Sequence, residues 1–385
     1  MYFVVRDFLD SKFKIQNSKL AKLVPALLAW FAANARDLPW RRTRDPYAIW
    51  VSEIMLQQTQ VKTVIPYWER WLRELPTVKA VATASPDKIH KLWEGLGYYT
   101  RARNLQKAAQ QIVEKHGGKF PEHLDDILAL PGIGRYTAGA ICSIAFNQPT
   151  PILDGNVIRV LTRVFGIAEN PKDRATNVGL WQLAEDLVGR AVPSPPRRGR
   201  ATAPCRSFLN QSLMELGALI CAPRSPHCGI CPVRKLCVAF REKRVEELPN
   251  LGKREAGKAR RFVAFVVEQD GRFLVRQRPA GVVNAHLWEF PNVEILNGNS
   301  HLKFAAKETL GFAPSDLAQL CTIKHSITRY RITLEAFRAN PGEIRVTPPS
   351  EIGVWKTPGQ MRRLAFTAAH KKLASVAFNC ILFVR

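Results

Sequence analysis

Long apolar runs are missing from this chain of 385 residues. No stretch approaches the roughly 20 apolar residues that a membrane-spanning helix needs. The first residues, MYFVVRDFLDSKFK, place Arg6, Asp7 and Asp10 where an export signal requires an apolar core. We therefore expect a protein that is neither exported nor inserted in a membrane, and whose cysteines stay in a reducing compartment where disulfides are rare.

Acidic residues are scarce relative to basic ones. The chain has 32 Asp and Glu against 57 Lys and Arg, a formal net charge of +25. Such an excess indicates a partner rich in phosphate, and nucleic acid is the first candidate. A basic protein of the ribosome or of a membrane surface is the alternative. A nucleic-acid partner predicts a cytoplasmic protein, associated with the nucleoid if the cell is bacterial.

Strand patterns are absent from the first part of the chain, where residues 18–240 predict one helix after another. Asp45 and the following Pro46 form a typical helix start. Residues 241–261 are charged and aperiodic, which indicates a linker. After it, residues 262–385 predict an α+β domain with strands, a turn at Gln-Asp-Gly, a short helix in HLKFAAKETLGF and a further strand in HSITRYRITLEAFRA.

The basic segment RAVPSPPRRGRATAPCRS, residues 190–207, interrupts the helical part. It predicts an exposed loop, and a plain disordered insertion is an equal alternative. The predicted fold is thus multidomain, with an all-α core followed by a separate α+β domain.

Four of the eight cysteines are clustered, with the spacing C-x6-C-x2-C-x5-C in CAPRSPHCGICPVRKLC. The cluster consists of Cys221, Cys228, Cys231 and Cys237. Zinc ribbons bring together two C-x-x-C knuckles, and this segment has one. Four thiols in so compact a loop suit a cubane iron–sulfur cluster better. The scattered cysteines predict ordinary packing; they are Cys142, Cys205, Cys321 and Cys380.

A glycine turn precedes a helix of small residues in LPGIGRYTAGAIC, residues 130–142. No Gly-Lys-Ser or Gly-Lys-Thr follows, which excludes a P-loop, and no βαβ unit surrounds the turn. Gly132 and Gly134 allow the backbone to approach a phosphate, and the amides of the next helix can bind it. The turn resembles the helix–hairpin–helix motif of DNA repair proteins. A simple packing corner between helices is the alternative.

The hairpin, the acidic Asp154 in PTPILDGNVIRV and the cysteine loop together resemble the iron–sulfur helix–hairpin–helix DNA glycosylases. Within that superfamily, LPWRRTRDPYAIWVSEIMLQQTQV, WEGLGYYTRARNL and LNQSLMELGALIC resemble the MutY-type adenine DNA glycosylases. The resemblance covers residues 20–380. It implies an enzyme of base excision repair that removes adenine paired with 8-oxoguanine or guanine in double-stranded DNA, acts as a monomer and carries a [4Fe–4S] cluster on the four clustered cysteines.

The resemblance also implies catalytic roles. Glu53 matches the acid that protonates the adenine ring, and Asp154 matches the carboxylate that stabilises the sugar cation, with or without a transient covalent adduct. Tyr136 and Asn156 match supporting positions. From the residues alone, a Glu on an amphipathic helix is in most cases a solvated side chain, although apolar neighbours would raise the pKa of Glu53 if it is buried. Asp154 is also a candidate N-cap for the helix that begins at Gly155, and it can serve both as a cap and in catalysis.

Other matches concern DNA contact. Gln58 and Tyr98 match positions that wedge into the duplex and offset the loss of stacking when a base is extruded. Arg101 follows Tyr98 closely and predicts a DNA contact, as do the backbones of Gly132 and Gly134. For Tyr98 the alternative is a core aromatic side chain.

The C-terminal part resembles the family's Nudix-like domain, which reads 8-oxoguanine. A working Nudix hydrolase binds magnesium through an acidic helix, and here Glu308 stands alone in AAKETLGF, so we predict no pyrophosphohydrolase activity. The lesion-reading loop, Phe-Ser-His in many members, aligns with Ile327, Thr328 and Arg329. The resemblance implies that Thr328 and Arg329 contact DNA. An ordinary β-hairpin is the alternative.

Two other functions compete. An endonuclease III-like lyase needs an amine for a Schiff base, and its Lys directly follows the Gly-x-Gly-Arg of the hairpin, where this chain has Tyr136. A non-catalytic iron–sulfur DNA-binding protein predicts the loss of Glu53 or Asp154, and both are present. The sequence therefore favours a monofunctional adenine glycosylase without strong lyase activity.

Overall fold

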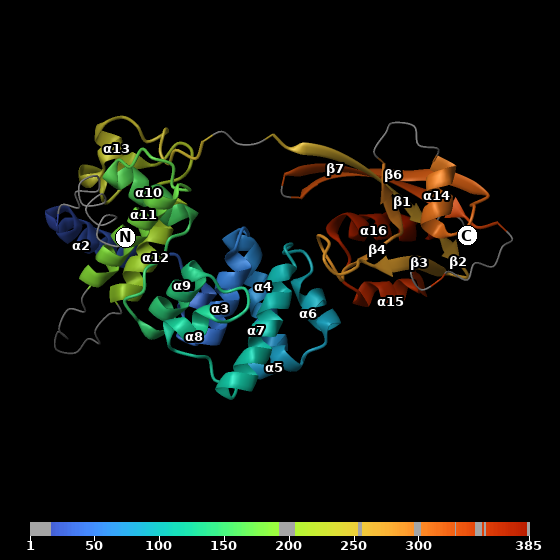
Figure 1. Cartoon of the computed structure of the whole chain (residues 1–385), viewed down its shortest axis with the longest axis horizontal. Helices are drawn as coiled ribbons and strands as arrows, with labels where there is room; N and C mark the ends of the chain where they lie inside the picture. The colour runs from blue at the N-terminus through green and yellow to red at the C-terminus, as the bar shows by residue number, and fades with distance from the viewer. Residues whose placement is uncertain are drawn as a thin grey trace. The chain divides into compact units, whose positions relative to one another are not determined.

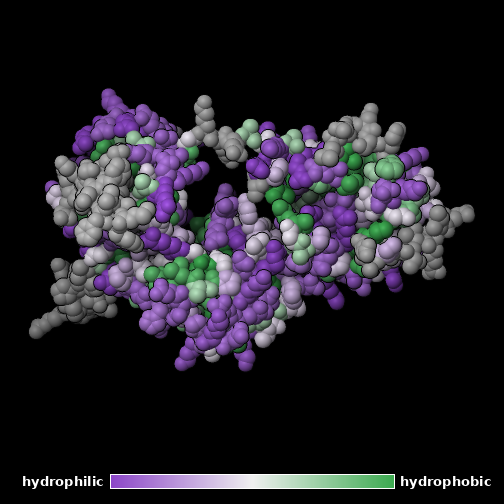
Figure 2. All heavy atoms as spheres, in the orientation of Figure 1, coloured by the Kyte–Doolittle hydropathy of each residue, from purple (hydrophilic) through white to green (hydrophobic). Residues whose placement is uncertain are grey.

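The computed structural model describes residues 17–191, 205–252, 256–295, 302–327, 329–342, 349 and 352–382. The chain divides into two compact units (Figure 1). The first consists of residues 1–83 and 104–254, and the second of residues 84–103 and 255–385. A short stretch of the helical part of the sequence, residues 84–103, therefore belongs to the second unit. On the face drawn in Figure 2, most of the surface of each unit is hydrophilic.

The first unit is helical, and no strand occurs among the residues of 18–240 that the structure describes. Its helices are α2 (Asn17–Asn34), α3 (Pro46–Leu56), α4 (Val61–Glu74), α5 (Val78–Thr83), α8 (Leu124–Leu128), α9 (Arg135–Phe146), α10 (Gly155–Phe165), α11 (Arg174–Arg190), α12 (Cys205–Leu219) and α13 (Val238–Arg241). Three 3₁₀ turns accompany them: η1 (Pro39–Arg41), η2 (Cys228–Ile230) and η3 (Arg234–Leu236). Helix α7 (Thr100–His116) begins in the second unit and continues in the first.

Local chemistry explains where the helices of the site begin. Asp45 accepts a hydrogen bond from the amide of Tyr47 and has Pro46 in the first turn of α3. Asp154 accepts from the amide of Val157 at the start of α10. Both predicted caps are confirmed. Helix α3 is buried from Tyr47 to Met55, so its polar residues must find partners inside the protein.

The second unit contains the strands. They are β1 (Lys258–Val266), β2 (Glu268–Gln269), β3 (Arg272–Gln277), β4 (Trp288–Glu289), β5 (Asn292–Glu294), β6 (Asp316–Ile327), β7 (Tyr330–Asn340) and β8 (Val354–Lys356). One sheet has the order β5-β1-β7-β6, with β1 and β7 parallel and the other pairs antiparallel. The other sheet has the order β2-β3-β4, with β8 also paired to β3. The helices of the second unit are α6 (Pro86–Trp93), α14 (Leu302–Leu310), α15 (Pro358–Arg363) and α16 (Ala368–Leu382).

Strand β1 shows how this unit builds a core on each face of its main sheet. Ala264 packs with Leu373 of α16 on one face, while Val263 and Phe265 pack with Leu310 of α14 on the other. Successive side chains of a strand point to opposite faces, which divides the apolar residues of β1 between the two cores. Helices therefore cover both faces of the sheet (Figure 1).

Some predicted elements differ from the structure. The strand expected in HSITRYRITLEAFRA is the end of β6 and most of β7, because the chain reverses between Ile327 and Tyr330. Strand β1 begins at Lys258, inside the range predicted as a linker. Of the basic segment 190–207, residues 192–204 lie outside the described residues. Within the described part of the chain, no helix combines the length and apolar character needed to cross a bilayer.

Candidate active site

A buried glutamate lies at the centre of the first unit. Glu53 is 5% exposed on α3, which packs against α9. From α9, the Tyr136 hydroxyl donates a hydrogen bond of 2.9 Å to Glu53 Oε2, and Met214 Sδ lies 3.3 Å from the same hydroxyl. The structure thus brings together Glu53 and Tyr136, which are 83 positions apart in the sequence.

Burial controls the ionisation of this carboxyl. Desolvation raises the pKa of Glu53 to about 7, and the charge of Asp154 adds to the rise. The hydrogen bond from Tyr136 and the charge of Arg41 act in the opposite direction but do not cancel the effect of burial. Burial also raises the pKa of Tyr136 well above its ordinary value, so its hydroxyl keeps the proton that it donates. Glu53 can therefore hold a proton close to neutral pH.

Asp154, at the N-terminus of α10, accepts its hydrogen bonds from N–H groups, whereas Glu53 accepts from a hydroxyl. Asp154 Oδ1 accepts from the Val157 amide at 2.8 Å, and its Oδ2 accepts from Asn156 Nδ2 at 2.9 Å. Burial raises the pKa of Asp154, and these hydrogen bonds limit the rise because they stabilise the carboxylate. The charge of Asp154 in turn helps to raise the pKa of Glu53. The arrangement suits one acid that holds a proton and one carboxylate held in place by N–H donors.

A buried arginine that the sequence reasoning missed supports Asn156. Arg159 Nη2 donates to Asn156 Oδ1 and to the Gly217 carbonyl, each at 2.8 Å. Its Nε donates to the Cys221 carbonyl at 2.7 Å. Arg159 and Arg163 are buried four residues apart on α10. Two arginines with helical spacing among apolar residues are the signal that could have revealed them.

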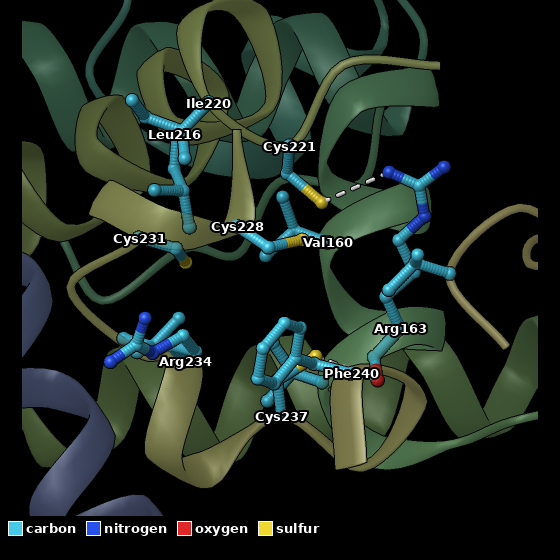
Figure 3. Close-up of a pocket in the computed structure, with 13 residues that line it drawn as sticks. Val160, Arg163, Leu216, Ile220, Cys221, Cys228, Cys231, Arg234, Cys237 and Phe240 are labelled. Atoms are coloured by element: carbon cyan, nitrogen blue, oxygen red, sulfur yellow. Dashed lines mark hydrogen bonds between the residues drawn. The ribbon is translucent and has the colours of Figure 1, made fainter. Parts of the chain in front are cut away.

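The four clustered cysteines come together around one pocket of the first unit (Figure 3). Cys228 lies in η2, and Cys237 directly precedes α13. Arg163 Nη1 donates to Cys221 Sγ at 3.3 Å, as the dashed line in Figure 3 marks. All four thiols are partly buried. The predicted cysteine set is thus assembled on one cavity of the first unit.

The possible metal ligands in this pocket are cysteine thiols. Burial raises the pKa of the Cys231 thiol to about 11, and burial likewise raises the pKa values of Cys228 and Cys237. Among the described residues, no three His, Cys, Asp or Glu side chains converge closely enough for a single metal ion.

The predicted glycine turn begins α9. Gly132 has a φ of +78°, and a Cβ at this position would lie 2.6 Å from the Cβ of Asn104, so a side chain is excluded there. Gly134 is the N-cap of α9, and a Cβ there would meet nothing within 4 Å. The space beside Gly134 is therefore open at the N-terminus of the 12-residue helix α9, the end of a helix whose amides can bind an anion.

The predicted wedge residues lie in strained turns. Gln58 follows α3, is exposed and has a φ of +55°. Tyr98, in the second unit, has a φ of +44° and is 46% exposed, which is high for a core aromatic side chain. Positive φ in residues other than glycine concentrates at functional sites. Arg101 is half-buried, and its Nη2 donates to the carbonyls of Leu96 and Gly97 within the same loop.

The predicted lesion-reading residues fall at the β6–β7 connection. Ile327 ends β6. Arg329 is exposed, and its guanidinium lies 5.5 Å from the centre of the Tyr330 ring. Thr328 lies outside the described residues. Glu308 is exposed on α14, at a site distant in sequence from this connection.

Comparison with known proteins identifies the family to which each part of the chain is similar. Residues 51–186 match the HhH-GPD superfamily of base excision DNA repair proteins, and residues 262–376 match the NUDIX domain. A solved structure of a thermostable thymine-DNA glycosylase is 32% identical, with a TM-score of 0.50, and the match covers 59% of this chain and 98% of that one. The helical core and these matches therefore define a helix–hairpin–helix DNA glycosylase.

Two relatives narrow the class. The adenine DNA glycosylase of Rattus norvegicus is 36% identical over 91% of this chain and 77% of its own length. That of Buchnera aphidicola subsp. Acyrthosiphon pisum (strain APS) is 38% identical over 69% of this chain and 72% of its own length. The chain belongs to the adenine DNA glycosylases. It is accordingly a DNA-binding N-glycosylase of base excision repair with a Nudix-like C-terminal domain, as the sequence predicts.

Proposed function

We propose that this enzyme removes adenine opposite 8-oxoguanine or guanine by acid-assisted cleavage and leaves the DNA strand uncut. The observation that carries the proposal is the raised pKa of the buried Glu53, about 7, next to the hydrogen-bonded carboxylate of Asp154. A carboxylic acid with a pKa near the working pH is the most effective general acid.

The chemistry follows from the two carboxyl groups. Protonated Glu53 gives its proton to N7 of the extruded adenine, and the bond between the sugar and the base breaks with both electrons leaving on the adenine. The sugar becomes an oxocarbenium ion, which the carboxylate of Asp154 stabilises. Water adds to this cation and loses a proton to Glu53, which restores the starting acid. Tyr136 orients Glu53, and Asn156 orients Asp154.

Tyr136 supports a monofunctional enzyme. Strand cleavage through a Schiff base needs a deprotonated amine at the sugar. A phenol held by Glu53 occupies the position that carries the lysine in lyases, and a phenol cannot form that intermediate. Borohydride trapping tests this point, because a trapped adduct that forms as fast as base release indicates a lyase.

We propose that Cys221, Cys228, Cys231 and Cys237 hold a [4Fe–4S] cluster. Four thiols that line one pocket suit a multi-iron cluster, and the N–H of Arg163 bonded to the Cys221 sulfur is typical support for such a ligand. The cluster, when bound, supplies a structural centre that orders the basic loop around it. A broad visible absorbance from iron–sulfur charge transfer in the purified protein tests the assignment, and a colourless zinc protein contradicts it.

DNA contact involves both units of the enzyme. In this proposal, Gln58 and Tyr98 wedge into the duplex, and the amides after Gly132 and Gly134 bind a phosphate. Arg101 serves DNA binding indirectly, because it holds the loop of Tyr98. Thr328 and Arg329 contribute the contact to 8-oxoguanine. The comparison of A:8-oxoguanine with A:G below tests whether the lesion-reading loop functions with these residues. The enzyme acts as a monomer in the cytoplasm, on the nucleoid in a bacterial cell.

Single-turnover excision decides the specificity. Duplexes with A:8-oxoguanine, A:G, A:C and thymine glycol are compared for the wild type and Glu53→Gln. We expect adenine release from the first two, fastest opposite 8-oxoguanine, and none from Glu53→Gln. Release of thymine glycol instead of adenine contradicts the proposal.

A further inference from the structure

A buried carboxylate joins α6 to the C-terminal part of the second unit. Glu94 directly follows α6 and is 9% exposed. Its Oε2 accepts from Lys371 Nζ at 2.7 Å and from Lys91 Nζ at 2.9 Å. Its Oε1 accepts from the Phe366 amide at 3.2 Å. This one side chain thus binds a backbone donor and a lysine from residues more than 270 positions away.

The segment that Glu94 holds is itself part of the sheet framework. The Trp288 amide donates to the Ala365 carbonyl at 2.9 Å, and the Thr367 amide donates to the Trp288 carbonyl at 3.1 Å. Lys371 lies in α16, which packs against β6. Strand β6 ends at Ile327, where the predicted lesion-reading connection begins. Glu94 is therefore bonded to the helix that supports this strand.

On its other side, Glu94 adjoins the loop that presents Tyr98. Trp93 Nε1 donates to the Gly97 carbonyl at 3.0 Å. Arg101 Nη2 donates to the carbonyls of Leu96 and Gly97 at 2.9 and 3.2 Å. The Arg101 guanidinium lies 5.3 Å from the centre of the Trp93 ring and 5.7 Å from that of Tyr98. The loop is thus bonded to itself on both sides of Tyr98.

The backbone of this loop adopts an unusual conformation. Gly95, Gly97 and Tyr98 have φ values of +111°, +68° and +44°. A residue such as Tyr98 keeps a left-handed conformation only when its surroundings impose it. Just beyond the loop, Arg103 Nη1 donates to the Ala285 carbonyl at 3.0 Å, which is a second tie to the C-terminal part of the unit. The loop of Tyr98 therefore lies between two attachments.

Stability alone does not explain the choice of a carboxylate at this point. Burial opposes the charge of Glu94, yet hydrogen bonds from Lys371 and Lys91 hold its pKa below the ordinary value. Buried ion pairs stabilise proteins little compared with apolar packing, but they fix the register of the elements that they join. A side chain with three directed contacts defines one position for α6 on its neighbours.

We propose that Glu94 is a positioning residue that fixes the Tyr98 loop to the framework of the β6–β7 connection, so that the rate of adenine excision depends on the base opposite. This inference rests on the proposed function, in which Tyr98 contacts the duplex and the second unit reads 8-oxoguanine. Loss of Glu94 leaves both contacts in the protein but removes the bond that couples them.

The measured quantity is the ratio of the single-turnover rates on A:8-oxoguanine and on A:G, with full-length protein. We expect Glu94→Gln to lower this ratio about fivefold or more, which corresponds to a typical coupling free energy between two sites. Lys371→Met removes the other partner of the bond. The Lys371 side chain is 58% exposed, so its loss disturbs folding little, and we expect a fall of the ratio in the same direction.

Glu289→Gln is the matched control. Glu289 is also buried, at 1% exposed, belongs to the same unit and pairs with Arg276 at 3.0 Å and with Arg278. These two bonds join Glu289 to arginines in and directly after β3, and within the described residues neither arginine belongs to the Tyr98 loop. We expect Glu289→Gln to lower the unfolding temperature and to leave the rate ratio unchanged.

A double-variant cycle separates positioning from simple destabilisation. If Glu94 acts through Tyr98, adding Glu94→Gln to Tyr98→Ala lowers the ratio no further. Multiplicative effects of the two substitutions, or an equal ratio for Glu94→Gln and wild type, overturn the inference alone. If wild type releases adenine equally from both duplexes, the inference alone fails. If it releases adenine from neither duplex, the proposed function fails, and the inference fails with it.

Discussion

Glu53 and Asp154 are both carboxylic acids, but their hydrogen-bond partners differ in kind. Asp154 accepts from a backbone amide and from Asn156, and such N–H donors stabilise a carboxylate. Glu53 accepts from the weakly acidic hydroxyl of Tyr136 in a site that excludes water. In the proposed mechanism, this difference divides the roles of proton donor and cation stabiliser between two residues of similar intrinsic acidity.

The pKa of Glu53 leads to a pH prediction. Because the acid form of Glu53 is required and its pKa is about 7, we expect the single-turnover rate of adenine release to fall as the pH rises through about 7. Rates measured at saturating enzyme across that range provide the check. A rate that rises through the same range contradicts the assignment of Glu53 as the acid.

Replacement of Tyr136 by Phe moves this profile. The Tyr136 hydrogen bond lowers the pKa of Glu53, so Tyr136→Phe raises that pKa and shifts the alkaline fall of the rate to higher pH. Tyr47→Phe is the control, since Tyr47 is also buried on α3 and its hydroxyl donates to the Leu75 carbonyl instead. We expect no shift for Tyr47→Phe, and an equal shift in both variants argues against the Tyr136 contact.

Glu53 also affects stability. The pKa of Glu53 is higher in the folded state than its ordinary value of 4.5. The free energy of unfolding therefore changes with pH between about 4.5 and about 7 because of this residue. Below pH 4.5 the residue is neutral in both states, and as the pH rises through 7 the folded protein loses up to about 3 kcal/mol relative to a neutral side chain. We therefore expect Glu53→Gln to unfold at a higher denaturant concentration than wild type at alkaline pH, with a smaller difference in acid. An inactive variant that is less stable than wild type at alkaline pH contradicts this reasoning.

At the scale of elements, helices α10 and α12 meet at a glycine. A Cβ on Gly217 would lie 2.6 Å from the Cβ of Asn156, and the Gly217 carbonyl accepts from Arg159. The close approach of these two helices places Asn156 beside Asp154. The active-site carboxylate therefore depends on a residue of α12 that takes no part in the chemistry.

Gly217→Ala tests this packing. Alanine normally favours a helix over glycine by about 1 kcal/mol, but here it displaces Asn156, and we expect lower stability together with at least about tenfold slower excision. Denaturant unfolding and single-turnover kinetics measure the two effects. Gly189→Ala in α11 is the control, because a Cβ there meets nothing within 4 Å, and we expect it to be neutral or stabilising.

Sequence patterns predicted the elements that depend on neighbouring residues. They were wrong where an element depends on residues far away in the sequence. The caps at Asp45 and Asp154 were readable because a side chain next to a helix start acts on its own backbone. The β6–β7 reversal was not, because alternation continues through the turn and residues on both sides resemble one strand. Strand pairing across the sheet depends on distant partners and has no local signal.

At the scale of the whole molecule, the net charge of +25 predicts strong dependence on salt. Each phosphate contact releases counterions, so we expect the dissociation constant for duplex DNA to rise at least about tenfold between about 50 and about 200 mM NaCl. Fluorescence anisotropy with inactive Glu53→Gln measures binding without turnover. An affinity that is insensitive to salt contradicts a binding mode dominated by phosphate contacts.

The sequence by itself determined the helical and α+β parts, the hairpin, the cysteine set and the family, because each of these depends on residues that lie close together or on motifs with fixed spacing. Only the tertiary structure decided which carboxyl is buried against Tyr136, because desolvation depends on every element packed around Glu53. It likewise joined Arg159 to the Gly217 carbonyl and Glu94 to Lys371. These contacts join residues through packing, which no local pattern records.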